Sequence, residues 1–292
     1  MSWKESNKTY QILKAAEEGG YGVAAPIAYN LEHIVAFVRA AEAKRSPLII
    51  QFFPWAITTT DGLLVRAAAE AARRASVPVA VHLDHAQDDA LIRHAADHLP
   101  FDSIMVDMSH YDDAENLQRT RELVAYCHAR QITTEAEPGR IEGGEDGVAD
   151  TVDLQGVMTT EQQIADFLAT GIDFLAPAFG NIHGEYGPAG PALDYGRLQA
   201  VTAGIAKRAR VVLHGTNGFS DAELQRCIAG GVSKVNINRL MLDDYLTFQK
   251  NEAAGLQLTT LVERGIAVTQ ALAESQMDVI GSSGKAPKAG KA

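Results

Sequence analysis

Short runs of apolar residues alternate with amphipathic segments along most of the chain. The apolar runs predict eight β-strands, which cover residues 22–25, 47–52, 77–83, 103–106, 133–136, 173–176, 211–213 and 234–237. Successive strands lie roughly 25 to 40 residues apart, which is the length of one strand–helix unit. Several of the runs, such as PLIIQFF, are apolar without interruption. That pattern is typical of parallel strands that are buried on both faces.

Between these strands, apolar residues recur with the period of an α-helix. The clearest helical segments cover residues 31–43, 62–75, 115–130 and 220–229. The last of them begins with Ser220 and has Glu223 three residues later, which is the spacing of a capping box. Eight strands, each followed by a helix, predict an α/β protein with a single (β/α)8 TIM barrel. The alternative is a doubly wound open sheet, but GxGxxG follows no early strand.

We expect the barrel to form one domain over residues 1–280. Residues 281–292, GSSGKAPKAGKA, are rich in Gly, Ser and Lys and predict a disordered tail. Residues 138–159 form an unusually long connection after the fifth strand and are rich in Gly and carboxylates. Long connections in compact domains are usually functional, and this one emerges at the barrel face that carries active sites. We interpret it as a mobile active-site loop, with a solvated surface loop as the alternative.

Charge and cysteine content narrow the class of protein. The 292 residues include 26 Lys and Arg against 37 Asp and Glu, for a formal net charge of −11. That charge argues against nucleic acid or an anionic membrane as the partner. Cys127 and Cys227 lie in helical segments and are expected to be buried, reduced thiols. The start lacks a signal-peptide pattern and no stretch approaches the ~20 apolar residues of a membrane span, so we expect a cytoplasmic protein.

Polar residues gather where the predicted strands end. His85, His183 and His214 stand at or just past the ends of the third, sixth and seventh strands. Three neutral imidazoles that converge on one rim are the ligand set of a catalytic zinc site with one position open for substrate. By alternation with Asp84, we interpret His82 as packing inside the barrel or supporting the site. Four other histidines lie in helical segments and have no predicted role: His33, His94, His98 and His128.

Two carboxylates are candidates for proton transfer. Asp84 directly precedes one of the three histidines, so its side chain could exchange a proton with a bound substrate. Glu145 lies in the long glycine-rich connection and could move into the site as a second base. Glycine, amide and hydroxyl residues complete the rim after the last three strands, where barrels often bind phosphate. They are Gly184, Gly215, Thr216, Asn217, Asn236 and Asn238.

Five blocks follow one another along the chain: VAVHLDHA, EAEPGRIEGGEDG, APAFGNIHGEYGP, VVLHGTNG and SKVNIN. In this order and spacing they resemble the zinc-dependent class II fructose-bisphosphate (ketose-bisphosphate) aldolases over nearly the whole chain. The resemblance implies reversible retro-aldol cleavage of fructose 1,6-bisphosphate into dihydroxyacetone phosphate and an aldehyde such as glyceraldehyde 3-phosphate. The same chemistry on a tagatose-type or other sugar-derived ketose is the alternative. The resemblance also implies a homodimer or higher homo-oligomer.

A metal site follows from the same resemblance. It implies Zn2+ on His85, His183 and His214, with Glu137 near the metal as an alternate or outer ligand. Another divalent metal in place of zinc, and an additional monovalent cation, both stay open. The metal would polarise the substrate ketone as a Lewis acid.

The resemblance further implies roles in proton transfer and substrate binding. Asp84 would handle the C4 hydroxyl proton as the C3–C4 bond breaks, and Glu145 would handle the proton on the dihydroxyacetone phosphate carbon. Asn236 would hydrogen-bond the enediolate that zinc holds. Gly184 and Gly215 would help to bind the phosphate of the three-carbon half.

At several substrate-holding positions the chain departs from the family pattern. Ile27 stands in place of the Asn of a Phe-Asn pair, and Phe53 stands in place of a Ser after the second strand. The phosphate loop has Asn217 for Ser, and the last strand ends in Asn238 and Arg239 where the family has an Asp-Thr pair. Phe53 cannot hydrogen-bond a phosphate, whereas Arg239 could supply charge. We therefore hypothesise that the retro-aldol chemistry is retained and that the substrate is altered.

Three other functions stay open. A Schiff-base lyase would use Lys234 on the eighth strand, although an ion pair or an outward-facing lysine is the simpler interpretation. A zinc hydrolase would use Asp84 as the base for metal-activated water. A non-catalytic barrel would have no physical need to keep Asp84, Glu145 and three histidines together.

Overall fold

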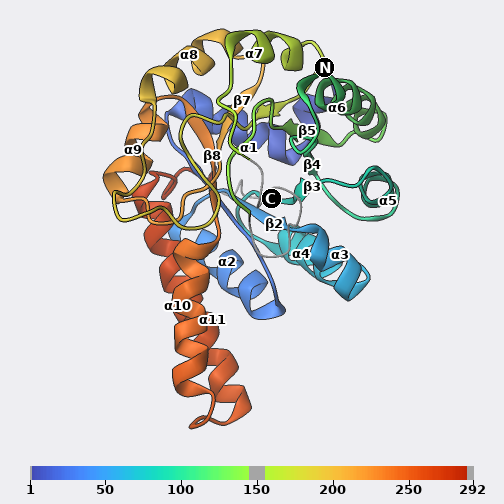
Figure 1. Ribbon diagram of the computed structural model, residues 1–292. Helices are drawn as coiled ribbons and strands as arrows, with labels where there is room; N and C mark the ends of the chain where they lie inside the picture. Colours follow the sequence, from blue (N-terminus) through green and yellow to red (C-terminus); the bar gives the residue numbers. More distant parts are fainter. Residues whose placement is uncertain (1, 145–154, 288–292) are drawn as a thin grey trace.

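The computed structural model describes residues 2–144 and 155–287, and in it the eight predicted strands form a closed barrel in sequence order (Figure 1). Each neighbouring pair is parallel, and β8 pairs with β1 to close the ring. The (β/α)8 TIM barrel is therefore confirmed. The strands are β1 (Val23–Pro26), β2 (Leu48–Phe52), β3 (Val79–Ala86), β4 (Ser103–Val106), β5 (Thr133–Ala136), β6 (Phe174–Leu175), β7 (Arg210–Leu213) and β8 (Val232–Ile237).

Helices follow the strands and cover the outside of the barrel (Figure 1). The four helices that the periodicity predicts are all present, with ends within about two residues of the predicted ones. The capping box of Ser220 and Glu223 is also present. The helices are η1 (Trp3–Ser6), α1 (Lys8–Gly19), α2 (Leu31–Lys44), α3 (Pro54–Thr60), α4 (Leu63–Arg74), α5 (Asp89–His98), α6 (Asp113–His128), α7 (Glu161–Leu168), α8 (Tyr195–Ile205), α9 (Asp221–Ala229), α10 (Arg239–Glu252) and α11 (Leu258–Val279).

One end of the barrel is closed by α1. Ile49 and Phe174 pack inside the barrel in the same apolar cluster as Ile12 of α1. Thr9 also hydrogen-bonds Ser103, the first residue of β4, at 2.9 Å. Because α1 contacts the amino ends of the strands, the carboxyl ends are the open face, where barrel enzymes place their active sites.

The last two helices extend away from the barrel as an antiparallel pair (Figure 1). α10 begins directly after β8, and α11 returns beside it and packs along α2. Among the described residues, no helix combines the length and the apolar character that crossing a membrane requires.

Part of the predicted disordered tail is ordered. Gly284 donates a backbone hydrogen bond to Lys44, and Ala286 donates one to Arg45, both at 2.8 Å. Ser282 is fully buried and its hydroxyl hydrogen-bonds that of Ser46. The prediction of disorder is therefore wrong for residues 281–287, because the lack of periodicity there reflects turns rather than a free chain. Residues 288–292 lie outside the described part.

The two cysteines are buried and unpaired, as predicted. Burial raises the pKa of the Cys127 thiol and that of the Cys227 thiol to about 12. Both thiols are therefore protonated near neutral pH and serve as small apolar side chains.

Candidate active site

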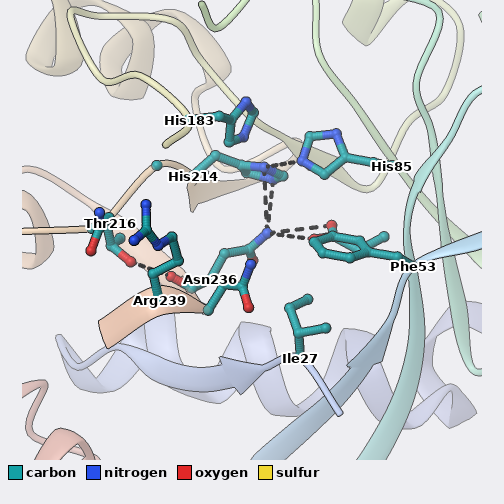
Figure 2. Close-up of a pocket in the computed structure, with 12 residues that line it drawn as sticks. Ile27, Phe53, His85, His183, His214, Thr216, Asn236 and Arg239 are labelled. Atoms are coloured by element: carbon teal, nitrogen blue, oxygen red, sulfur yellow. Dashed lines mark hydrogen bonds between the residues drawn. The ribbon is translucent and has the colours of Figure 1, made fainter. Parts of the chain in front are cut away.

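Three histidines meet at the open face of the barrel, as the sequence predicts. His85 comes from β3, and His183 and His214 follow β6 and β7. They line one cavity at this face (Figure 2). One ligand nitrogen from each lies within 4.8 Å of the others. The arrangement could hold one metal ion with nitrogen ligands.

A buried carboxylate fixes the tautomer of His214. Nε2 of His214 lies 2.7 Å from Oε1 of Glu135. The other oxygen of Glu135, Oε2, accepts a 2.7 Å hydrogen bond from Nζ of Lys234. Burial opposes ionisation of Glu135, but Lys234 and His214 outweigh it and lower the pKa of Glu135 to about 2. An ionised carboxylate only accepts hydrogen bonds, so Nε2 of His214 carries the hydrogen. Its Nδ1 is left with a lone pair that faces the cavity.

Asp107 holds His85 in the same way. Nδ1 of His85 lies 2.7 Å from Oδ2 of Asp107. Burial opposes ionisation of Asp107, but the hydrogen bond from His85 outweighs it and holds the pKa of Asp107 below its usual range. Nδ1 of His85 therefore donates, and Nε2 is the nitrogen that is available to a metal.

A backbone irregularity lets neighbouring residues reach the same cavity. Successive side chains of a strand normally point to opposite faces. His85 has φ +46°, and the register between β3 and β4 shifts between Leu83 and Ala86. As a result Asp84 and His85, although adjacent in sequence, both line the cavity. A left-handed backbone is uncommon for a residue other than glycine, and such strain is typical of functional sites.

The imidazole nitrogens of His85 and His214 that face each other require a proton or a metal cation between or beside them. Nε2 of His85 and Nδ1 of His214 lie 3.0 Å apart, and two lone pairs at that distance repel each other. Burial opposes protonation of His85, but Asp84 and Asp107 outweigh it and raise the pKa of His85 to about 10. In the absence of metal a proton satisfies this pair. The same donor set suits a divalent metal, because each imidazole is backed by a carboxylate.

His183 offers the third nitrogen. Its Nε2 is buried and has no hydrogen-bond partner among the described residues. Burial, together with the charge of His85, holds the pKa of His183 well below its usual value, so its ring is neutral. A buried, neutral and unpaired imidazole nitrogen fits a metal ligand. The hydrogen-bond partners and burial of the three histidines therefore fit a set of metal ligands.

Glu137 lies near His85 but is not among the described residues that line the cavity. It forms a possible metal-holding group with His85 and Asp107. One of its oxygens accepts the backbone N–H of Ile141 at 2.5 Å, and the other is buried without a partner among the described residues. Burial and the charge of Asp107 hold the pKa of Glu137 well above its usual value. This position suits the alternate or outer ligand that the resemblance implies.

Asp84 and Asn236 form a pair in the cavity that the histidines line. Nδ2 of Asn236 lies 3.1 Å from Oδ2 and 3.3 Å from Oδ1 of Asp84. Burial opposes ionisation of Asp84, but His85 and other positive neighbours outweigh it and hold the pKa of Asp84 well below its usual value. Oδ1 of Asn236 is buried without a partner among the described residues. The pair therefore presents an ionised carboxylate and an unused amide oxygen to a ligand.

The predicted phosphate-binding residues lie together on one side of the cavity. Gly215, Thr216, Asn217, Asn238 and Arg239 all line it. Gly184 adjoins them, since Nδ2 of Asn217 donates to its carbonyl at 3.0 Å. Gly215 has φ +66°, and a Cβ there would lie 2.2 Å from the carbonyl oxygen of Ile182.

Arg239 is the described arginine that reaches the cavity, and it has acidic partners. One of its nitrogens lies 3.0 Å from Glu185 and 3.1 Å from Asp243. The hydrogen bond to Asp243 raises the pKa of Arg239 further, although burial opposes it. Its charge is therefore partly neutralised before any ligand binds.

A buried ionic network inside the barrel contacts His214, and the sequence did not predict it. Lys234 is fully buried and its Nζ lies 2.7 Å from Glu135. The expectation of an ion pair is confirmed, whereas an outward-facing lysine is wrong. His82 lies inside the barrel, with Nδ1 2.7 Å from the Ser103 hydroxyl. The alternation of side chains along a strand could have identified these residues. Lys234 shares a strand face with Asn236, and Glu135 shares one with Glu137.

Glu145 lies outside the described residues, so its placement stays a prediction. The stem of its loop is described. Arg140 and Val157 exchange two backbone hydrogen bonds at 2.9 and 2.8 Å, and His183 donates one to Glu142 at 2.7 Å. The described start of the connection therefore runs directly beside a candidate metal ligand.

Comparison with known proteins gives the family. The family model for class II fructose-bisphosphate aldolase matches residues 7–285. A putative fructose-bisphosphate aldolase of Coccidioides immitis is 53% identical over 97% of this chain and 96% of that protein. The fructose-bisphosphate aldolase of Streptococcus pneumoniae serotype 4 is 36% identical over 94% of this chain and 98% of that protein.

Solved structures agree with the sequence matches. A crystal structure of a putative fructose-1,6-bisphosphate aldolase from Coccidioides immitis has a TM-score of 0.94 at 54% identity, covering 96% of this chain and 98% of that one. The YdjI aldolase of Escherichia coli K12 has a TM-score of 0.80 at 27% identity, covering 95% and 98%. The chain belongs to the class II fructose-bisphosphate aldolase family and is a lyase.

Proposed function

We propose that this protein is a zinc-dependent aldolase that reversibly cleaves a ketose phosphate into dihydroxyacetone phosphate and an aldehyde. The observation that carries the proposal is the set of three imidazole nitrogens within 4.8 Å, next to the ionised Asp84. Fructose 1,6-bisphosphate, with glyceraldehyde 3-phosphate as its aldehyde product, is the reference substrate because the family is named for it.

His85, His183 and His214 would hold the metal through Nε2 of His85, Nε2 of His183 and Nδ1 of His214. A divalent cation bound there supplies Lewis-acid polarisation of a carbonyl oxygen. Zinc suits a site of three imidazoles with one open position, and Glu137 could serve as an outer ligand. Glu135 and Asp107 keep the imidazoles of His214 and His85 in the tautomers that leave these nitrogens free.

Asp84 would accept a proton in the cleavage direction. As the C3–C4 bond breaks, the C4 hydroxyl gives its proton to the Asp84 carboxylate and C4 becomes the aldehyde carbon. The electron pair of that bond stays on C3, which then takes a proton from a second acid. We propose Glu145 for this second acid, because it lies in the block that matches the family. Asn236 would orient a substrate hydroxyl through its unused Oδ1.

The loop after β7 would hold the phosphate of the three-carbon half. At Gly215 the backbone bends with a positive φ and approaches Ile182 too closely for a side chain. Such backbone leaves room for a phosphate to reach main-chain N–H groups. Gly184, Thr216, Asn217, Asn238 and Arg239 would complete the phosphate-binding side.

A coupled assay tests the proposal. Release of dihydroxyacetone phosphate from fructose 1,6-bisphosphate and from fructose 1-phosphate is measured on the purified enzyme, after chelation, and after zinc is added back. We expect activity that chelation removes and zinc restores. Activity that survives chelation and is lost on borohydride trapping with substrate would instead point to an imine lysine. Lys234 is a poor candidate for one, since its ammonium is paired inside the barrel.

A zinc hydrolase and a non-catalytic barrel gain no support from a specific feature of the site. Self-association and a cytoplasmic location stay predictions. Size-exclusion chromatography with light scattering would measure the oligomeric state. We expect a homodimer or larger homo-oligomer.

A further inference from the structure

We propose that the aldehyde half of the substrate is uncharged and presents an apolar group, so that the enzyme cleaves a ketose 1-phosphate with an unphosphorylated end. This inference rests on the proposed aldol function and names the substrate class of the same site. It is drawn from the contrast between the two sides of the cavity, one polar and one apolar.

The apolar side is built by the ends of β1 and β2. Ile27 and Phe53 line the cavity, and they are only 5% and 2% exposed. They form a small cluster of their own, separate from the main core, with Tyr29 packed against it. The Phe53 ring lies 6.1 Å from the His85 ring, between centroids. An apolar wall therefore stands directly beside the candidate metal ligands.

Aromatic residues extend this wall toward solvent. The Tyr29 ring lies 6.3 Å from the Phe53 ring and 6.1 Å from the Trp55 ring. Trp55 is 37% exposed. A substrate that reaches past Asp84 on this side meets hydrocarbon and ring surfaces first.

The cationic side of the cavity is elsewhere. Figure 2 places Phe53 across the view from Thr216 and Arg239, with Asn236 between them. Apart from the histidines, Arg239 is the positively charged residue among the described residues that line the cavity. It is already paired with two carboxylates. One phosphate can use this side together with the loop at Gly215.

A second phosphate would have to lie against Ile27 and Phe53. There it would lose its hydration and gain no lysine or arginine from the described part of the cavity, which is unfavourable for a dianion. An uncharged aldehyde that ends in a methyl or methylene group avoids this cost and buries apolar surface on the wall.

A panel of aldehydes tests the inference in the condensation direction, in which the enzyme itself sets the configuration at C4. Zinc-loaded enzyme receives dihydroxyacetone phosphate with propanal, lactaldehyde, glyceraldehyde or glyceraldehyde 3-phosphate. C3 loses a proton and bonds to the aldehyde carbon, and the aldehyde oxygen gains a proton. We expect kcat/KM for the best uncharged aldehyde to exceed that for glyceraldehyde 3-phosphate by at least about tenfold. A preference for the phosphorylated aldehyde would overturn the inference.

Two variants and a control sharpen the test. Phe53→Ser should lower kcat/KM for propanal and lactaldehyde relative to glyceraldehyde, whereas Phe53→Leu should keep the wild-type order because it stays apolar. Leu258→Ser, at a 74% exposed position on α11, is the matched control and should leave all ratios unchanged. If Phe53→Ser does not fold, Phe53→Leu and the aldehyde panel on the wild-type enzyme still test the inference.

The failure of the inference is distinguishable from that of the proposed function. Enzyme that exchanges the C3 proton of dihydroxyacetone phosphate but uses none of the uncharged aldehydes would overturn the inference alone. Enzyme that neither exchanges that proton nor consumes any aldehyde would overturn both.

Discussion

Glu135 accepts a 2.7 Å hydrogen bond from Nε2 of His214, although Glu135 lies on β5 and His214 follows β7, far away in sequence. The contact leaves Nδ1 of His214 as an acceptor, 3.0 Å from Nε2 of His85. Lys234 balances the charge of the carboxylate inside the barrel. We therefore expect Glu135 and Lys234 to be positioning residues, which would act through His214 on a metal bound at this site.

Replacing Glu135 tests this relationship. Glu135→Gln can still accept a hydrogen bond but removes the charge, and we expect zinc affinity to fall by roughly 10- to 100-fold. Zinc affinity is measured by competition with a fluorescent chelator. Glu70→Gln is the matched control, because Glu70 pairs with Arg73 and Arg74 at the surface. Unchanged zinc affinity in Glu135→Gln would contradict the role assigned to this carboxylate.

Removal of its counterion has a different expected effect. Lys234→Met leaves Glu135 buried without its cation, and breaking a buried pair costs about 3–5 kcal/mol of folding free energy. We expect a clear loss of stability in urea unfolding of the chelated protein. A double variant, Lys234→Met with Glu135→Gln, should recover part of that loss. Equal stability of the single and double variants would show that the pair is not coupled.

Zinc binding should release a proton. The pKa of His85 is raised to about 10 in the metal-free site, so at pH 7.5 this imidazole carries the proton that a metal must displace. Zinc affinity should therefore rise with pH and flatten as pH approaches 10, because below that value protons compete with the metal. Calorimetric titration in two buffers of different ionisation enthalpy measures the release, expected at about one proton per zinc. Binding heats that do not depend on the buffer would rule this out.

Asp84 should be needed for turnover but not for the metal. Asp84→Asn keeps the shape and removes the proton acceptor, and loss of a positioned base typically lowers kcat by 10²- to 10⁴-fold, roughly. Metal content by mass spectrometry should stay at the wild-type level. A variant that loses its zinc instead would make Asp84 a structural residue of the site.

Gly215 offers a test of the phosphate side. An alanine Cβ would lie 2.2 Å from the carbonyl oxygen of Ile182, and φ is +66°. We expect Gly215→Ala to displace the loop and raise KM for dihydroxyacetone phosphate. Gly218→Ala is the control, because Gly218 also has a positive φ (+73°) but has no atom within 4 Å of an added Cβ. Similar KM values for the two variants would mean that the close approach at Gly215 has no part in binding.

Much of this site follows from the sequence, because parallel barrel strands carry apolar runs and end in polar residues at one face. That regularity is enough to bring His85, His183 and His214 together. It does not predict the left-handed backbone of His85, which lets Asp84 share the cavity, since the shift between β3 and β4 depends on how the strands pair. Nor does it predict that Glu135 contacts His214, because that pairing depends on the barrel's closure.

Hydrogen–deuterium exchange of dihydroxyacetone phosphate tests the central claim most directly, since it requires the metal site and the proton-transfer residues but no aldehyde. The substrate is incubated with enzyme in D2O and C3 is followed by proton NMR. We predict that zinc-loaded enzyme replaces one of the two C3 protons with deuterium, that chelated enzyme does not, and that added zinc restores the exchange. Absence of exchange with zinc bound, or equal exchange after chelation, would contradict a metal-dependent aldolase.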